Sequence, residues 1–254
     1  SCGDYFCCVV KRSGRVACWG HNQFGQLGFE DVSPTVCSSG PEEPGVPCTM
    51  TPRPLADLDS VVSLVSGEGH SCALLSTGEV SCWGDNTFGQ VGASDNGSIT
   101  RPTIVEGLPP DDPVVSVTAR MNTTCVALSS GDVACWGARM TGGETVTVDD
   151  GPDPRNVSAL YNMVQVELSD IGLCGRLGSG AIRCAYSEET SVGLSDFWDA
   201  VDLGCASDYC CLTRSSGQSM CWGVVPEVLA GFPMSTPTLD LLPVVEFFED
   251  EVTP

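Results

Sequence analysis

The residues best able to do chemistry in this sequence are its 16 cysteines. Ten of them form five pairs with nine residues between the two cysteines, and four pairs end in Cys-Trp-Gly, as in CVVKRSGRVACWG at residues 8–20. A glycine-containing turn lies inside every pair. Such regular spacing predicts one disulfide per pair. The pairs are Cys8 and Cys18, Cys72 and Cys82, Cys125 and Cys135, Cys174 and Cys184, and Cys211 and Cys221.

The other six cysteines stand in two arrangements. A Cys-x4-Cys-Cys frame begins at Cys2 and again at Cys205, and two further cysteines flank a proline-rich insertion. Neighbouring cysteines can bind metal, but zinc sites favour Cys-x2-Cys spacing, so we expect short disulfides here and no metal ion. The additional bridges expected are Cys2 to Cys7, Cys205 to Cys210, and Cys37 to Cys48.

Sixteen cysteines that all pair locally are typical of an oxidising compartment. The chain begins at Ser1-Cys2 without an initiator methionine, as we expect of a processed mature chain. We therefore predict a secreted protein, extracellular or at the cell surface.

Few other residues are arranged for catalysis. His21 and His70 are the only histidines, and both occupy repeated positions, which favours structural roles. The sequence has no Gly-x-Ser-x-Gly elbow, His-Glu-x-x-His helix or phosphate-binding loop, so we expect neither an enzyme nor a cofactor. The acidic pairs at 111–112 and 149–150 lack a calcium-coordination spacing and are expected in solvated loops.

The charge balance limits the possible partners. The 33 acidic and 11 basic residues give a net charge of -22, so no basic surface is available to neutralise phosphates. Nucleic acid and anionic membranes are therefore not expected as partners. No apolar run approaches the roughly 20 residues that cross a bilayer, so membrane insertion is not expected either.

The elements that position the cysteines are predicted to be strands. Short alternating apolar runs begin eleven residues before four of the paired cysteines, at Val61, Val114, Met163 and Ala200. Each run predicts one strand, and a hairpin with a cysteine on either arm follows it. Pairing about the glycine turn should place the cysteines opposite each other, at a Cα separation of about 4.4 to 6.8 Å.

These units repeat along the chain. They average about 51 residues in the 254-residue sequence, enough for four strands each. A four-stranded antiparallel blade buries its faces by stacking with others around an axis, which predicts an all-β, five-bladed β-propeller in a single domain over 1–254. The expected units are 1–60, 61–113, 114–162, 163–199 and 200–243, followed by a closing strand at 244–254.

The first unit lacks its leading strand, because only seven residues precede Cys8. Residues 236–248 echo 51–65 and supply an additional strand with no hairpin after it. We expect this strand to fill the vacancy beside the first blade of the same chain or of a neighbouring molecule. The residues expected to make the closure or the assembly contact are Val244, Val245, Phe247 and Phe248.

Several motifs carry a family resemblance. Gly-x-x-His-Ser-Cys-Ala-Leu at 67–74, and Cys-Trp-Gly-x-Asn-x-x-Gly-Gln-Leu/Val-Gly at 18–28 and 82–92, resemble the repeat of the regulator of chromosome condensation family. The cysteine-bearing version is similar to the ectodomains of Crinkly-type plant receptor kinases. This resemblance implies a propeller, but the family's functions include nucleotide exchange, lactamase inhibition and receptor ectodomains. The seven-bladed, chromatin-binding branch fits this acidic, cysteine-rich chain poorly.

The expected function combines these features. The sequons at Asn96, Asn122 and Asn156 predict N-linked glycans in a secreted chain. We expect a non-enzymatic extracellular structural glycoprotein that assembles with itself into a surface polymer, filament or coat. The alternatives are a ligand-binding or adhesion ectodomain that binds another extracellular protein, and an inhibitor of a secreted enzyme.

Overall fold

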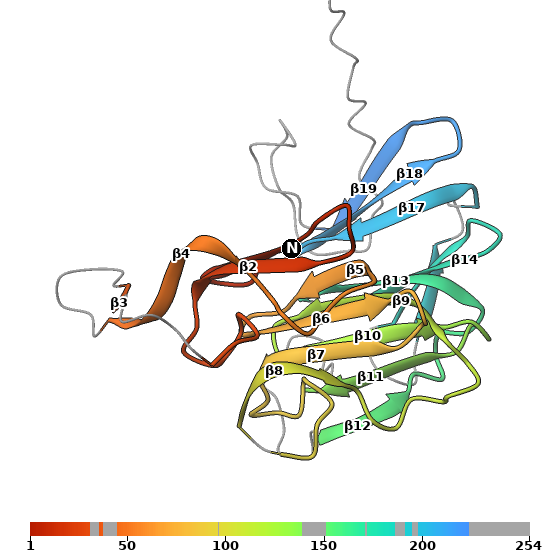
Figure 1. Ribbon diagram of the computed structural model, residues 1–254. Coiled ribbons are helices and arrows are strands. Elements are labelled where there is room, and N and C mark those ends of the chain that lie inside the picture. Colours follow the sequence, from red (N-terminus) through yellow and green to blue (C-terminus); the bar gives the residue numbers. More distant parts are fainter. Residues whose placement is uncertain are drawn as a thin grey trace, which may run out of the picture.

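The computed structural model consists of β-strands and their connections, with no helix among the residues that it describes. The strands form five antiparallel sheets, which we number in chain order (Figure 1). The described residues are 1–30, 36–37, 45–95, 97–138, 151–170, 172–185, 191–194 and 198–223.

Each sheet takes consecutive strands of the chain. Sheet 1 contains β1 (Phe6–Val10), β2 (Val16–His21), β3 (Val36–Cys37) and β4 (Val46–Pro54). Sheet 2 contains β5 (Val61–Ser66), β6 (His70–Leu75), β7 (Val80–Asp85) and β8 (Ser98–Ile104). Sheet 3 contains β9 (Val114–Arg120), β10 (Thr123–Leu128), β11 (Val133–Gly137) and β12 (Gly151–Asn156).

The last two sheets follow the same plan. Sheet 4 contains β13 (Met163–Ser169), β14 (Gly172–Leu177), β15 (Ile182–Ala185) and β16 (Ser191–Leu194). The described part of sheet 5 contains β17 (Ala200–Cys205), β18 (Tyr209–Arg214) and β19 (Ser219–Gly223). The four leading strands predicted from the apolar runs are β5, β9, β13 and β17, so those predictions are confirmed.

The sheets are the blades of a β-propeller. In sheets 2 to 4 the strand order follows the chain, and the first strands β5, β9, β13 and β17 lie against one another in succession (Figure 1). These first strands are therefore the innermost strands, nearest the axis. The predicted closing strand at 244–254 lies outside the described residues.

The hairpins that carry the paired cysteines have the predicted register. In each of the five hairpins the two cysteines face each other directly, for example Cys72 opposite Cys82. Their Cα separations are 4.0 to 4.1 Å, shorter than the separation that we expected. In sheet 1, the Cys8 amide donates to the Ser1 carbonyl, and the Ser1 amino group donates to the Cys8 carbonyl. The backbone of Cys8 thus bonds away from β2, so Cys8 and Cys18 form a non-hydrogen-bonded pair. Antiparallel backbones approach each other most closely at such pairs.

The hairpin turns depend on glycine. In sheet 2, the amide of Gly78 donates to the Leu75 carbonyl, and the amide of Leu75 donates to the Glu79 carbonyl. Gly78 has a φ of 86°, in the left-handed region that a side chain disfavours. This is a three-residue hairpin loop with its glycine at the left-handed position, and it fixes the register that brings the cysteines together.

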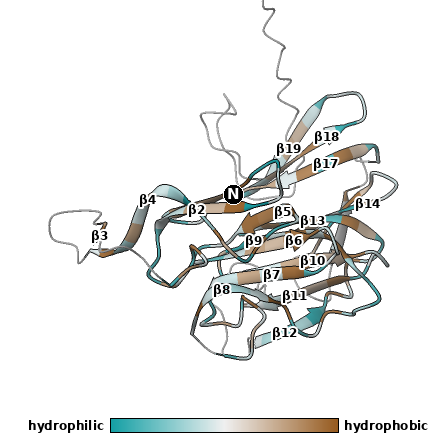
Figure 2. Ribbon diagram, in the orientation of Figure 1, coloured by the Kyte–Doolittle hydropathy of each residue, from teal (hydrophilic) through white to brown (hydrophobic). Residues whose placement is uncertain are grey.

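The core lies between the sheets. Four hydrophobic clusters join sheet 1 to 2, 2 to 3, 3 to 4, and 4 to 5. Figure 2 shows the inner strands β5 and β17 as hydrophobic and the outer strand β12 as hydrophilic. Burial therefore depends on stacking, and a single sheet would leave an apolar face exposed.

Candidate functional site

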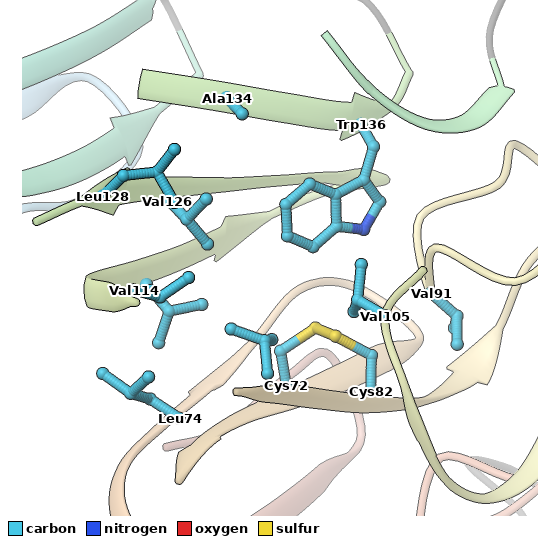
Figure 3. Packing of buried hydrophobic residues seen from close by; sticks show 12 residues of the cluster. Cys72, Leu74, Cys82, Val91, Val105, Val114, Val126, Leu128, Ala134 and Trp136 are labelled. Carbon is cyan, nitrogen blue, oxygen red and sulfur yellow. A yellow bond between two sulfur atoms is a disulfide. The ribbon is translucent and has the colours of Figure 1, made fainter. Parts of the chain in front are cut away.

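Every sheet has two faces of different chemistry. We call the face that carries the hairpin disulfide the staple face, and the opposite face, which carries the residue after the second cysteine, the tryptophan face. Between sheets 2 and 3, the Cys72–Cys82 disulfide faces Val126 and Trp136 (Figure 3). Trp136 is completely buried there.

The other interfaces repeat this match. The staple face of one sheet packs against the tryptophan face of the next in all four clusters. Thus Cys8 and Cys18 of sheet 1 cluster with Trp83 of sheet 2. In sheet 4 the tryptophan position is held by Ala185, which is also completely buried. The repeat therefore specifies a directional contact between consecutive sheets.

The loop over residues 86–92 makes the sheet 2 to sheet 3 contact specific. The indole Nε1 of Trp136 donates to the Gln90 carbonyl at 3.0 Å. The Gln90 side chain accepts from the Phe88 amide, and the Asn86 side chain accepts from the Val91 amide, which holds the loop in shape. A buried indole N–H needs such an acceptor.

The same loop recurs at residues 22–28, where the Gln26 carbonyl accepts from the Trp83 indole at 2.9 Å. In the sequence this motif contributes to the family resemblance, but its role as a hydrogen-bond acceptor was not predicted. A partial signal was available, because the loop motif occurs only in the first two units, and the sheets that follow them carry Trp83 and Trp136. The third and fourth units lack the loop; the sheet after the third carries Ala185, but the sheet after the fourth carries Trp222.

His70 lies in this interface and not on the surface. Its Nε2 is 2.8 Å from Thr124 Oγ1, and the Thr124 hydroxyl donates to the Gln90 carbonyl. The hydroxyl has one proton, so His70 Nε2 must be the donor and Nδ1 is unprotonated. Nδ1 has no hydrogen-bond partner. Complete burial lowers the pKa of His70 to about 4, although Asp85 opposes the shift. The other histidine, His21, stacks on Tyr5.

Among the described residues, no preceding sheet covers the tryptophan face of sheet 1. Val9 on this face is 43% exposed, and Trp19 is half-buried where Trp83 and Trp136 are completely buried. None of the four clusters of the described residues joins this face to sheet 5. The edge of β1 at Val9 and Val10 also lacks a partner strand among the described residues.

The fifth sheet leaves its staple face uncovered among the described residues. Cys211 and Cys221 are half-buried, whereas the other eight staple cysteines are at most 5% exposed. Thr213 and Ser219 stand on this face, at the positions that Leu74 and Val80 hold in sheet 2. The uncovered face is thus more polar than its buried counterparts. The tryptophan face of sheet 1 and the staple face of sheet 5 are the candidate functional site, which we call the end faces.

A polar cavity lies at the axis. It has a volume of about 380 Å³ and is lined mainly by the inner strands β5, β9, β13 and β17. The Gln165 amide donates to Asp202 Oδ1 at 2.9 Å and its carbonyl oxygen accepts from Arg176 at 3.1 Å. Burial raises the pKa of Glu167, which also lines this cavity, to about 7.

The structure places all sixteen cysteines in eight disulfides, with the pairing expected from the sequence, and none is free.

The predicted glycosylation sites differ in exposure. Asn156 is exposed at the end of β12. Asn122 is half-buried and its side-chain oxygen accepts from Gln90. The predicted residues outside the described part of the chain are Asn96, Val244, Val245, Phe247 and Phe248.

Possible metal ligands are few in the part of the chain that the structure describes. One group of three, Cys174, Cys205 and Cys210, has its sulfur atoms within 4.8 Å of one another, but all three are in disulfides. Asp112 accepts hydrogen bonds from Ser129 and Ser130. It lies in a surface loop, as the sequence predicted. The pair at 149–150 lies outside the described residues.

Comparisons with known proteins agree with this architecture. Residues 1–26 and 61–90 match the regulator of chromosome condensation (RCC1) repeat. The probable E3 ubiquitin-protein ligase HERC3 of Homo sapiens is 29% identical over 180 residues, which cover 69% of this chain and 15% of the ligase. The chain spans only 10 to 17% of the curated relatives reported for it.

Solved structures share the fold. Human WBSCR16 aligns with a TM-score of 0.71 and 20% identity, over 88% of this chain and 60% of its own. Prp20p from Saccharomyces cerevisiae, whose structure was described with its binding to Gsp1p and histones, aligns with a TM-score of 0.63 and 19% identity, over 85% and 55%. No helix among the described residues is long and apolar enough to span a membrane. The repeated sequence, the stacked four-stranded sheets and these likenesses together identify the chain as an RCC1-like β-propeller.

Proposed function

We propose that this protein is a non-enzymatic, extracellular structural glycoprotein that assembles with itself through its end faces. The observation that carries the proposal is a difference between the end faces and the faces inside the stack of sheets. Each internal staple face is covered by a tryptophan face, whereas one face of each kind is left uncovered among the described residues. A staple face on one molecule and a tryptophan face on the next form a head-to-tail contact, which generates a polymer when its rotation does not close.

The cysteine chemistry supports an extracellular location. Eight disulfides leave no free thiol, and every bridge is local, with a sequence separation of at most 11 between its partners. Bridges of this kind persist in oxidising compartments and stabilise a sheet by restricting its unfolded chain. N-linked glycans at Asn96, Asn122 and Asn156 belong to the same proposal.

The proposal is tested by the assembly state of the full chain. We expect light scattering to show a mass that rises with protein concentration, and electron microscopy to show strings of rings. Val9→Arg should prevent assembly, because it puts an unpaired charge into a contact that the internal interfaces make with apolar residues.

Ile104→Arg is the matched control. Ile104 is 46% exposed on the outer strand β8, away from the end faces, and Val9 is 43% exposed. Both variants thus add one charge at a half-exposed aliphatic position of a strand. Equal assembly of the two variants, or a chain that stays monomeric at every concentration, would remove the proposal.

A second candidate function is the binding of a cationic ligand, which corresponds to the ligand-binding or adhesion alternative. A concavity of about 490 Å³ extends over the loops of sheets 1 and 2, and no lysine or arginine is among its lining residues. Aromatic rings beside carboxylates suit an ammonium or guanidinium group. The aromatic and acidic lining residues are Tyr5, His21, Phe24, Phe88, Asp4, Glu68 and Asp85.

Calorimetric titration with spermine, as a simple polyamine probe, tests this second function. Phe24→Ala should weaken binding roughly fivefold, because one cation–π contact contributes about 1 kcal/mol. Ile104→Ala, which lies outside the concavity, serves as the control. If Phe24→Ala and the unaltered protein bind spermine equally well, the concavity is not the site.

A further inference from the structure

The interface between sheets 4 and 5 brings two disulfides into contact. One is the staple Cys174–Cys184 of sheet 4, and the other is Cys205–Cys210 of sheet 5. The Sγ atoms of Cys174 and Cys210 are 3.9 Å apart. The sulfur of Cys205 lies within 4.8 Å of both. A sulfur of one bridge is therefore the immediate neighbour of a sulfur of the other.

The equivalent position carries a hydroxyl group at two of the other interfaces, and Leu173 holds it in sheet 4. Cys210 directly precedes the first staple cysteine of its sheet, as Ser71 does in sheet 2 and Thr124 in sheet 3. Ser71 Oγ lies 4.0 Å from Cys8 Sγ, and Thr124 Oγ1 lies 3.8 Å from Cys72 Sγ. This position thus points at the staple of the preceding sheet. A hydroxyl cannot exchange with a disulfide, but a thiolate can.

We propose that these two bridges form a thiol–disulfide exchange site whose substrate is a small thiol reductant. A thiolate of the reductant attacks Cys205 Sγ and forms a mixed disulfide, and the Cys205–Cys210 bond breaks with its electron pair on Cys210. The Cys210 thiolate attacks Cys174 Sγ, a Cys174–Cys210 bond forms, and Cys184 leaves as a thiolate. Cys184 takes up the proton that the reductant lost, so two disulfides and one thiol are present before and after.

A dithiol reductant carries the reaction one step further. Its second thiol attacks the mixed disulfide, releases Cys205 as a free thiol and leaves as the oxidised, cyclic disulfide. The net change is a two-electron oxidation of the dithiol. The protein keeps one cross-sheet bond, Cys174–Cys210, and gains two thiols, on Cys184 and Cys205.

Burial sets the direction of the attack. Cys174, Cys184 and Cys210 are 5%, 2% and 3% exposed, whereas Cys205 is only partly buried at the end of β17. A reductant therefore reaches Cys205 first and expels Cys210. The new thiolate then has the Cys174 sulfur beside it at a high effective concentration, whereas solvent thiols are excluded from the interface.

The exchange changes which sheets the disulfides connect. Before it, each of the two disulfides joins strands within one sheet. After it, a single covalent bond joins sheet 4 to sheet 5. In the presence of a reductant, the site thus converts two disulfides that each lie within one sheet into one disulfide that joins sheet 4 to sheet 5. It does not depend on the proposed assembly.

The chain contains a matched control for this chemistry. The Cys2–Cys7 bridge has the same separation of five as Cys205–Cys210 and occupies the equivalent position in sheet 1. Cys2 is exposed and Cys7 is half-buried. Among the described residues, no third cysteine sulfur forms a close group with this bridge. Its reduction should simply give two free thiols.

The test is limited reduction of the native full chain with dithiothreitol. After an acid quench, free thiols are alkylated and the remaining disulfides are mapped by mass spectrometry. Molecules that have lost the Cys205–Cys210 bond should carry label on Cys205 and Cys184 in equal amounts, together with a Cys174–Cys210 linked peptide. Molecules that have lost the control bridge should carry label on Cys2 and Cys7. Label on Cys205 and Cys210 with Cys174–Cys184 intact would overturn the proposal.

A pair of variants gives a second measurement. Cys205→Ser leaves Cys210 without its partner, so alkylation of the native protein should label Cys184 at the expense of Cys210. The matched variant Cys2→Ser should label Cys7 alone. Label confined to Cys210 in Cys205→Ser contradicts the exchange. The experiment on the unaltered chain needs no substitution and decides the question if a variant fails to fold.

Discussion

The interface between sheets 2 and 3 and the interface between sheets 4 and 5 share one geometry but differ in chemistry. In the first, Trp136 is completely buried, and its indole, the Gln90 carbonyl and the Thr124 hydroxyl are hydrogen-bonded. In the second, Trp222 is half-buried and Cys210 stands at the position of Thr124. The repeat therefore preserves the stacking direction, while an additional disulfide replaces a hydrogen bond at the less buried interface.

Two ionisable groups in different parts of the molecule behave in opposite ways. His70, between sheets 2 and 3, has a pKa lowered to about 4 by burial. Glu167, in the axial cavity lined by sheets 2 to 5, has a pKa raised to about 7, again mainly by burial. Both groups are neutral when the fold is most stable, so acid weakens the sheet 2 to sheet 3 interface and base weakens the packing around the axial cavity.

The largest effect is expected from truncating the buried tryptophan. Trp136→Ala should lower the free energy of unfolding by about 3 to 5 kcal/mol, because it removes a completely buried indole and leaves a cavity. Trp222→Ala should cost only about 1 kcal/mol, since that side chain is half-buried. Chemical denaturation with the disulfides intact measures both. Equal losses would mean that the two interfaces are equally packed and that the comparison fails.

Acid titration of His70 should have the next largest effect. Its pKa is 6.5 unfolded and about 4 folded, so stability is unaffected above pH 6.5 and falls as the pH drops from 6.5 to 4. A shift of this size corresponds to a loss of roughly 3 kcal/mol at pH 4. Denaturation curves at pH 7.5 and pH 4 measure it, with His70→Gln as the comparison. A variant with the same acid sensitivity as the unaltered protein would exclude His70 as the cause.

Glu167 should produce the opposite pH dependence. Its pKa rises from 4.5 unfolded to about 7 folded, so stability is highest below pH 4.5 and falls as the pH rises to 7. Because the side chain is partly exposed, the loss should be discounted to about 2 kcal/mol. Glu167→Gln removes the charge and should stabilise the protein at pH 8 but not at pH 4. Equal stabilisation at both pH values would indicate a packing effect and no titration.

The sequence predicts local features of this fold better than contacts between units. The hairpin staples were predictable, because a glycine turn such as the one at Gly78 sets the cross-strand register within a few residues. The contact of Cys174 with Cys210 was not, because it spans 36 residues and depends on how two sheets stack. The acceptor role of the Gln90 carbonyl was missed for the same reason, because the hydrogen bond joins two sheets and the recurring loop motif does not identify its partner.

The smallest effect is expected from an ion pair that links three sheets. Arg120 at the end of sheet 3 pairs with Asp170 of sheet 4 and donates to Ser207 of sheet 5. The hydrogen bond to Asp170 is the main cause that raises the pKa of Arg120. The two side chains are 33% and 28% exposed, so Arg120→Met should cost about 1 kcal/mol, and less in high salt.

Arg101 provides the control for this ion pair. It pairs with Glu30, but the two side chains are 67% and 62% exposed. Arg101→Met should therefore change the free energy of unfolding by less than about 0.5 kcal/mol. A salt-independent loss in Arg120→Met, or an equal loss in Arg101→Met, would show that the pair contributes no specific link between sheets 3, 4 and 5. In that case the sheet 4 to sheet 5 interface would depend on its apolar cluster, its two neighbouring disulfides and the hydrogen bonds of Gln165 to Asp202 and Leu203.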